Sequence, residues 1–320
     1  MKQSLAKLLP IFDILATPFV MVAAHLLKLV RRIGVQRLPL SKAQLMRIGV
    51  FPIRDHYYEP LFNTKVLALP LNAERDLPGI DWNVQGQLDL LGQFKFNDEL
   101  KGIGTHKTDC TTFHFGNGAF ESGDAEFLYN IIRHKKPRRI FEIGSGNSTL
   151  IARRAIAKNA EESPGYSCKH VCVEPYEMPW LERTGVTVLR DRVEQMAPSF
   201  FDELESGDLL FIDSSHVIRP QGDVLFEFLS LLPRLTEGVV VHVHDIFSPR
   251  DYLDSWVKGE VKLWNEQYLL EAFLTCNSQW KIIGALNYLT HNHYEAFSRT
   301  CPYLARDREP GSFYIERHSR

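Results

Sequence analysis

The stretch RIFEIGSGNSTL, residues 139–150, decides the fold of this chain. An apolar strand with an acid near its end runs into the turn Gly144-Ser145-Gly146 and then into a helix, which we expect Asn147 or Ser148 to cap. Such a turn presents backbone N–H groups at a helix start, where they can bind a ligand. Thr149 stands where a dinucleotide fingerprint places its third glycine, so a pyrophosphate packed against the helix is disfavoured.

The composition describes a large globular chain. Its 320 residues, 44% of them hydrophobic, predict one full α/β domain with an appendage. The formal net charge of -2 argues against nucleic acid as a partner, because phosphate binding needs a basic excess. The densest basic run, residues 133–139, precedes the first strand and is predicted to be a solvated face. The five cysteines are scattered and lack paired zinc spacing, which predicts reduced thiols in a cytosol-like compartment.

Residues 1–37 are predicted to form an amphipathic N-terminal helix. Ile14 to Leu27 carry no formal charge, and apolar residues from Leu5 to Val30 recur at helical spacing. The apolar run falls short of the ~20 residues that a membrane span requires, so we expect the helix to lie in a membrane interface rather than to cross the bilayer. Packing on the domain or on a second copy of the chain would produce the same stripe. Peripheral contact with the inner face of a membrane and a homo-oligomer are therefore both open.

Residues 38–120 are predicted to form an irregular cap or substrate region, because prolines punctuate short apolar runs and no repeat is present. Within this region, Asp55 to Pro60 combines acidic, aromatic and polar groups in six residues. That composition suits a sugar or another polyol, whose rings stack on aromatic side chains and whose hydroxyls donate to carboxylates. Aromatic residues that only pack would give the same composition.

Strands and helices alternate through residues 121–320, which we take as the main domain. The predicted strands are 139–143, 170–174, 186–189, 208–213, 238–244, 280–289 and 312–316, and the predicted helices are 148–158, 222–232 and 266–274. The last two strands are separated only by a loop, which implies one antiparallel strand. The predicted fold class is therefore α/β, with a Rossmann-like, seven-stranded, mostly parallel sheet and helices on both faces.

This order of elements and the glycine turn resemble the class I S-adenosylmethionine-dependent methyltransferases, across roughly residues 124–317. The resemblance implies that S-adenosylmethionine is the cofactor and that the glycine loop wraps its methionine end. The loop residues that match the family's cofactor-binding pattern are Glu142, Gly144, Ser145, Gly146 and Ser148.

Two further positions match the same cofactor site. Glu174 ends the second predicted strand, where the family places the acid that binds the ribose hydroxyls. A carboxylate can accept bonds from both vicinal hydroxyls, which a neutral side chain does less well. Asp191 follows the third strand, where the family contacts adenine, although a charged turn would look the same.

Polar clusters follow the fourth and fifth predicted strands, at residues 213–216 and 242–245. Because parallel strands end at one edge of a sheet, we expect the acids and imidazoles of these clusters to converge. Two carboxylates and an imidazole can hold a divalent cation, and a second imidazole of near-neutral pKa can remove a proton. The converging residues are Asp213, His216, His244 and Asp245.

The Asp-x-x-His pattern and the later pair resemble metal-dependent sugar O-methyltransferases of natural-product biosynthesis and cephalosporin-hydroxylase-like proteins. The resemblance implies Asp213, His244 and Asp245 as ligands of Mg or Mn. It also implies His216 as the base, with Asp213 as a second catalytic residue that belongs to the cofactor site as well. His244 stands where those relatives carry an acid, and this favours manganese or another transition metal, or no metal. A hydrogen-bonded Asp–His cluster without chemistry is the structural alternative.

These features predict methyl transfer from S-adenosylmethionine to an oxygen of a polyhydroxylated acceptor, either a glycan or a glycosylated natural product. One alternative is a hydroxylase-like relative of the same fold. Another is a catalytically silent, membrane-associated scaffold subunit, although a scaffold would not need the retained acids and His216. We expect a cytoplasmic location.

Overall fold

The computed structural model describes residues 2–318, with the side chains of residues 7–318. The chain divides into two compact units, Met1–Leu69 and Pro70–Arg320. The side chain of Leu5, predicted to begin the apolar stripe, lies outside the described residues. The helices of the first unit are α1 (Lys2–Ile33), η1 (Val35–Arg37), α2 (Pro39–Ile48) and η2 (Thr64–Val66).

The helices of the second unit precede the first strand or lie between strands along the chain, and the strands form a single sheet. They are α3 (Val84–Gln93), α4 (Asn97–Leu100), α5 (Asp124–Lys135), α6 (Asn147–Glu162), η3 (Leu181–Thr184), η4 (Val193–Gln195), η5 (Pro198–Glu203), α7 (Asp223–Phe226), the π-helix η6 (Glu227–Leu231), η7 (Leu232–Arg234), the π-helix η8 (Ser255–Gly259), α8 (Glu266–Leu274), α9 (Leu286–Asn292) and α10 (Tyr294–Phe297). The predicted helix 222–232 is therefore an α-helical turn that continues as a π-helix.

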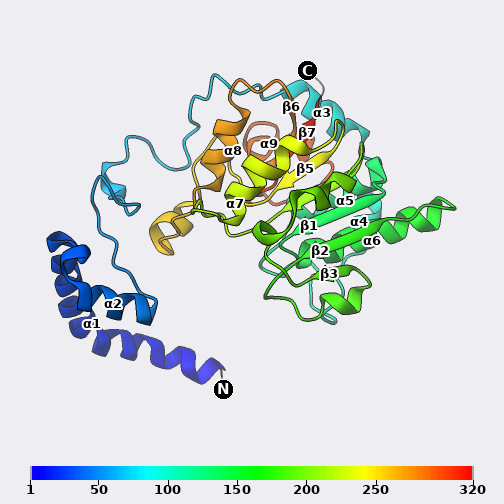
Figure 1. The fold of residues 1–320 in the computed structure, drawn as a ribbon. Coiled ribbons are helices and arrows are strands. Elements are labelled where there is room, and N and C mark those ends of the chain that lie inside the picture. The colour runs from blue at the N-terminus through cyan, green and yellow to red at the C-terminus, as the bar shows by residue number, and fades with distance from the viewer. Residues whose placement is uncertain (1, 319–320) are drawn as a thin grey trace. The chain divides into compact units, whose positions relative to one another are not determined.

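The sheet has seven strands in the order β3-β2-β1-β4-β5-β7-β6 (Figure 1). The strands are β1 (Arg139–Ile143), β2 (Lys169–Val173), β3 (Thr187–Leu189), β4 (Leu209–Ile212), β5 (Val240–Val243), β6 (Trp280–Ala285) and β7 (Phe313–Arg317). Strands β1 to β5 pair in parallel, and β7 is antiparallel to both of its neighbours, β5 and β6. The predicted seven-stranded, mostly parallel sheet with one antiparallel strand is confirmed.

The connection between the last two strands differs from the prediction. Strand β6 ends at Ala285, and α9 and α10 then lead to β7, so the predicted strand 280–289 is wrong over its last four residues and the connection is not a plain loop. Leu286 and Leu289 are both buried and lie three residues apart, on one side of α9. A short apolar run does not distinguish a buried strand from a buried helix by its pattern alone.

Helices cover both faces of the sheet, as predicted. Alternate residues of each strand point to opposite faces, so Leu209 and Phe211 of β4 join one core and Leu210 and Ile212 join the other. The first core contains residues of α3, α5, α6 and α9. The second core contains residues of η5, η6 and α8. The carboxyl ends of β1, β2, β4 and β5 meet at one edge, which positions the candidate site.

The basic run before β1 is not a uniformly solvated face. Arg133 on α5 is buried, and it forms ion pairs with Glu99 and Glu162 and a hydrogen bond to Asn159. The prediction of a solvated face is therefore wrong for Arg133, because its long side chain reaches over α6 to partners distant in the sequence.

The first unit is dominated by α1, a helix of 32 residues. In the part of the chain that the structure describes, Lys7–Ile33 is a helix long and apolar enough to cross a membrane, so the expectation that the apolar run is too short for a span is wrong. Arg31 pairs with Glu59, and Arg54 lies near the same carboxylate. Glu59 of the proposed sugar-binding hexapeptide is therefore occupied by cations, whereas Tyr57 beside it is exposed.

Candidate active site

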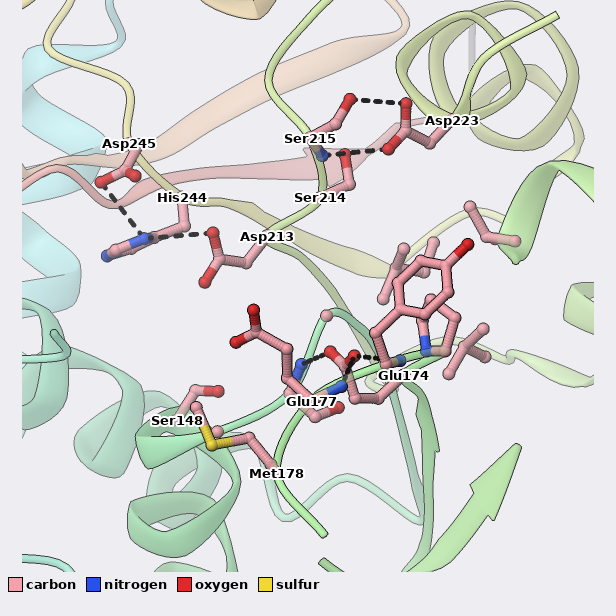
Figure 2. A pocket seen from close by; sticks show the side chains of 18 of the residues that line it. Ser148, Glu174, Glu177, Met178, Asp213, Ser214, Ser215, Asp223, His244 and Asp245 are labelled. Atoms are coloured by element: carbon pink, nitrogen blue, oxygen red, sulfur yellow. Dashed lines mark hydrogen bonds and ion pairs between the residues drawn. The ribbon is translucent and has the colours of Figure 1, made fainter. Parts of the chain in front are cut away.

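A pocket of about 650 Å³ opens at the carboxyl edge of the sheet. Its walls come from the glycine loop, the loops after β2 and β3, the loops after β4 and β5, and residues 118–120 before α5. Figure 2 shows Asp213, His244 and Asp245 on one side of the pocket, facing the loop that carries Glu174 and Glu177. The volume lies in the range of small-molecule sites. The glycine loop and the Asp–His cluster therefore share one cavity.

The glycine loop approaches the end of β4 very closely. Gly144 has φ +76°, and a Cβ built on it would lie 1.9 Å from the backbone oxygen of Asp213. The Asp213 N–H donates to the carbonyl of Ile143, 2.8 Å away. Only glycine combines this left-handed backbone with so close an approach. Gly144 therefore sets the position of Asp213 on the pocket wall.

Helix α6 starts differently from the prediction. Its N-cap residue is Gly146, and the capping by Asn147 or Ser148 is wrong. The Thr149 hydroxyl instead accepts a bond from the Gly146 N–H at 3.2 Å, and donates to the Glu142 carboxylate at 2.6 Å. The Thr149 side chain thus occupies the position where a dinucleotide-binding motif has its third glycine.

Glu142 lies behind the pocket, not in its wall. Its side chain is fully buried on the α6 side of the sheet, bonded to Thr149, Ser148 and His170. The His170 Nε2 lies 2.6 Å from the Glu142 carboxylate. The direct cofactor contact predicted for Glu142 is therefore corrected to a positioning contact: the strand's alternation directs Glu142 under the helix. Ser145, Gly146 and Ser148 do line the pocket.

Glu174 lines the pocket directly after β2. Its carboxylate accepts bonds from the backbone N–H groups of Tyr176 at 3.0 Å, Glu177 at 2.9 Å and Ser145 at 3.4 Å. These bonds fix the acid beside the glycine loop. Asp191 is exposed and does not line the pocket, so its predicted adenine contact is corrected. Residues 192–194, just after it, line the pocket instead, because the chain turns inward there at η4.

The acids and imidazoles after β4 and β5 converge as predicted. His216 Nε2 lies 3.3 Å from Asp213 and 3.6 Å from Asp245. His244 Nδ1 lies 3.6 Å from Asp213 and 3.3 Å from Asp245. On its other nitrogen, His216 contacts the carboxylate of Glu266 at 2.8 Å. His244 lines the pocket, whereas His216 is buried behind the two aspartates.

Neighbouring carboxylates raise the pKa values of both imidazoles in the cluster. Burial alone would lower the pKa of His216, but bonds to Asp213 and Glu266 raise the pKa well above its ordinary value. Burial would also lower the pKa of His244, but the carboxylates of Asp245 and Asp213 raise the pKa to about 10. Both imidazoles therefore carry a proton near neutral pH in the protein alone. The expected near-neutral pKa of His216 is corrected, because the sequence does not reveal how many carboxylates surround the ring.

Two residues of the cluster have left-handed backbones. His216 has φ 60° and Asp245 has φ 59°, although neither is glycine. Such a conformation costs about 1–2 kcal/mol for a residue with a side chain. Strain of this kind persists where the surrounding structure fixes it, and it is concentrated at functional sites. The backbone geometry therefore marks the same residues as the charge cluster.

The donor set fits a divalent cation. Asp213, His216 and Asp245 offer ligand atoms that lie within 4.8 Å of one another. This set contains His216 where the sequence predicted His244. The contact of Glu266 with the other nitrogen of His216 is typical of a metal-bound imidazole. A mixed set of carboxylates and imidazole suits manganese or another transition metal better than magnesium.

Sequence reasoning missed several residues of the site. The sequence predicted a helix from Glu266 but no contact between Glu266 and His216, which lies 50 positions before it. Glu227 is buried nearby, where it accepts a bond from Ser214 and begins the π-helix η6. Asp223 accepts bonds from the backbone and hydroxyl of Ser215. These residues stand on helices without a local motif, so only the folded chain brings them to the strand ends.

Known proteins resemble this chain in sequence and in structure. Residues 141–246 match a family described as "Methyltransferase domain". An uncharacterized protein of Archaeoglobus fulgidus is 29% identical over 171 residues, which cover 49% of this chain and 74% of that protein.

Among solved structures, the O-methyltransferase TomG of Streptomyces achromogenes, in complex with SAM, is 14% identical, with 72% of this chain and 90% of TomG covered and a TM-score of 0.38. The methyltransferase MycE of the mycinamycin pathway, in complex with Mg and SAH, is 12% identical, with 60% of this chain and 48% of MycE covered and a TM-score of 0.32. These TM-scores are low, so the assignment rests on the family match and the strand order. Residues 141–246, from β1 to the loop after β5, are therefore similar to a methyltransferase domain, and they include the five parallel strands of the sheet.

Proposed function

We propose that this protein transfers the methyl group of S-adenosylmethionine to an oxygen of a polyhydroxylated acceptor. The observation that carries the proposal is the single pocket that joins the glycine loop and Glu174 to the Asp–His cluster. The loop and Glu174 offer a place for a nucleoside, and the cluster offers groups that hold and move protons. Bound S-adenosylmethionine would supply an activated methyl group on its sulfonium.

The cofactor half of the proposal rests on three groups. The Glu174 carboxylate would accept bonds from the ribose hydroxyls. The backbone at Ser145 and Gly146, which line the pocket, would bind the methionine end. The Tyr176 ring, which lines the pocket and contacts the guanidinium of Arg192, would cover the adenine.

The acceptor half rests on the cluster and its aromatic neighbour. Trp256 lines the pocket with His244 and Asp245, and an indole face is a good surface for a sugar ring. Carboxylates on the same wall would accept bonds from hydroxyls and so orient one oxygen toward the methyl group. These features favour a sugar or another polyol over an apolar acceptor.

His216 is the proposed base and Glu266 its positioning residue. The Glu266 carboxylate contacts Nδ1, so Nε2 is the atom that faces the two aspartates. These carboxylates keep His216 protonated in the protein alone, and a divalent cation bound to Asp213 and Asp245 would offset their charge and so leave Nε2 free to take the proton. A divalent cation held by Asp213, Asp245 and one of the two imidazoles would acidify an acceptor hydroxyl. If His216 is the ligand, His244, which lines the pocket, would be the base.

The binding step is tested first, by titration calorimetry with S-adenosylhomocysteine. Saturable binding is expected, and Glu174→Gln should weaken it by about tenfold or more, since hydrogen bonds to a charged group contribute ~1.5–3 kcal/mol. Glu161→Gln, an exposed acid of α6, is the matched control and should bind as the wild type does. Tight binding of NAD with no binding of S-adenosylhomocysteine would rule the proposal out.

Transfer itself is tested with S-adenosylmethionine labelled in its methyl group and a panel of sugars and glycosylated small molecules. Label should appear on an acceptor oxygen. Transfer only to nitrogen or sulfur of other compounds would contradict the acceptor class while leaving cofactor binding intact.

A further inference from the structure

The long helix α1 leaves its apolar surface uncovered. Over residues 7–33, Val30 alone is buried, whereas Phe12 is 68% exposed and Phe19 is 78% exposed. Soluble proteins rarely leave so large a continuous apolar surface in water. The first unit itself therefore does not cover this surface.

Polar side chains follow one side of α1 along its whole length. At ~100° per residue, they fall within about a third of the circumference, and the large apolar residues occupy most of the rest. The polar residues are Lys7, Asp13, Thr17, His25, Lys28, Arg31 and Arg32. A helix that crosses a bilayer has no reason to keep such a stripe, whereas a helix that lies in the bilayer interface requires one.

The charge of the following segment is strongly one-sided. Residues 14–54 contain seven lysines or arginines and no aspartate or glutamate, although the whole chain has a formal net charge of -2. Of these cations, Lys28, Arg32, Arg37, Lys42 and Arg47 are exposed and make no ion pair with any residue that the structure describes. An anionic surface is the complementary partner.

A second copy of the chain fits this surface poorly. Two α1 helices packed in parallel would bring their basic carboxyl-terminal ends together, and these like charges repel. Pro10 and Pro18 lie inside the helix, and each removes a backbone hydrogen bond and bends the axis, which disturbs a regular helix seam. Lipid accommodates a bent helix more easily than a matching protein groove does.

We propose that α1 lies in the interface of an anionic lipid bilayer, with its apolar side among the acyl chains, and that the five exposed cations between residues 28 and 47 bind lipid phosphates. The apolar side supplies insertion and the cations supply selectivity for anionic headgroups. This anchor is independent of the methyl transfer proposed above.

Flotation of the full chain with vesicles tests the anchor. The protein should float with vesicles of phosphatidylcholine and phosphatidylglycerol, and much less with phosphatidylcholine alone. Phe12→Gln with Phe19→Gln should weaken binding by about 100-fold, because burying one Phe changes partition by roughly tenfold or more. Thr17→Gln with His25→Gln, on the polar side, is the matched control and should bind as the wild type does.

A second pair of substitutions tests how much the cations contribute to vesicle binding. Lys28→Gln with Arg32→Gln should weaken binding to the anionic vesicles by about 25-fold, at roughly fivefold per cation, and leave binding to phosphatidylcholine unchanged. Arg31 is left in place because it pairs with Glu59. Alkaline carbonate should then release the bound protein, as it does interfacial helices.

Four outcomes would overturn the proposal. The first is a wild-type protein that floats with neither kind of vesicle, and the second is an equal loss of binding for the Gln pairs on the apolar and polar sides of the helix. The third is resistance to carbonate, which would indicate a spanning helix. The fourth is a dimer that forms without lipid and that the two Phe substitutions dissociate.

Discussion

Replacing Gly144 by alanine is the most direct test of how the cofactor loop and the Asp–His cluster are joined. The new Cβ would meet the Asp213 carbonyl oxygen at 1.9 Å, and that oxygen belongs to the backbone at the end of β4, which has little freedom to move. The backbone at φ +76° adds about 1–2 kcal/mol for a residue with a side chain. Overpacking of a well-packed site typically adds ~1–3 kcal/mol. Gly144→Ala should therefore lower the free energy of unfolding by roughly 2–5 kcal/mol.

Thermal and denaturant unfolding measure this loss. A change of that size lowers the Tm of a domain of this length by roughly 4–20 °C. Gly146→Ala is the matched control, two positions along the same loop, because its φ of 177° suits any residue and its Cβ would meet only the Met178 methyl group at 3.7 Å. The control should unfold within ~1 kcal/mol of the wild type while weakening S-adenosylhomocysteine binding, since Gly146 lines the pocket. A stable Gly144→Ala variant, or an equal loss for both variants, would refute the account of the loop.

Three further predictions concern the residues around the pocket. Thr149→Val removes the donor to Glu142 and the acceptor of the Gly146 N–H. Urea unfolding should show that the free energy of unfolding falls by ~1–3 kcal/mol, and Thr149→Ser should retain most of it. An unchanged urea midpoint would show that this buried network does not contribute to stability. The raised pKa of His244 makes its stabilisation complete below the unfolded-state pKa of 6.5 and lost as pH rises through about 10. In chelator, His244→Asn should reduce this decline in unfolding free energy and leave the part that belongs to His216, and a decline of unchanged size would exclude His244 as a source. Chelator should suppress methyl transfer but spare cofactor binding, and His216→Ala should reduce kcat by ~10²–10⁴-fold; a much smaller reduction would leave His216 a structural residue.

The sequence predicted the sheet well because the signals for parallel strands are local. Strand β1 and helix α8 have the predicted limits, since an apolar run or an amphipathic period lies within each segment. The error at β6 arose where the same apolar signal continues from a strand into a buried helix at Leu286. Periodicity over so few residues cannot separate the two states.

The candidate site could be located from the sequence but not completed. Topology alone brings Asp213 and Asp245 together, because both follow adjacent parallel strands. The orientation of Glu142 away from the pocket depends on strand alternation and on a histidine of β2, and neither is visible in the glycine motif itself. Glu266 could not be found, because its contact with His216 joins distant parts of the chain.

The place of β7 in the sheet has a consequence for how the protein is made. Strand β6 pairs only with β7, and β7 is synthesised after it, with residues 286–312 between them. During translation, the parallel strands β1 to β5 can therefore assemble before β6 has a partner. Until then, the backbone groups of β6 are unpaired and its apolar side chains are uncovered. β7 has to enter between β5 and β6 to complete the sheet, so these two strands keep unpaired edges, which are prone to aggregation, until Phe313–Arg317 has left the ribosome.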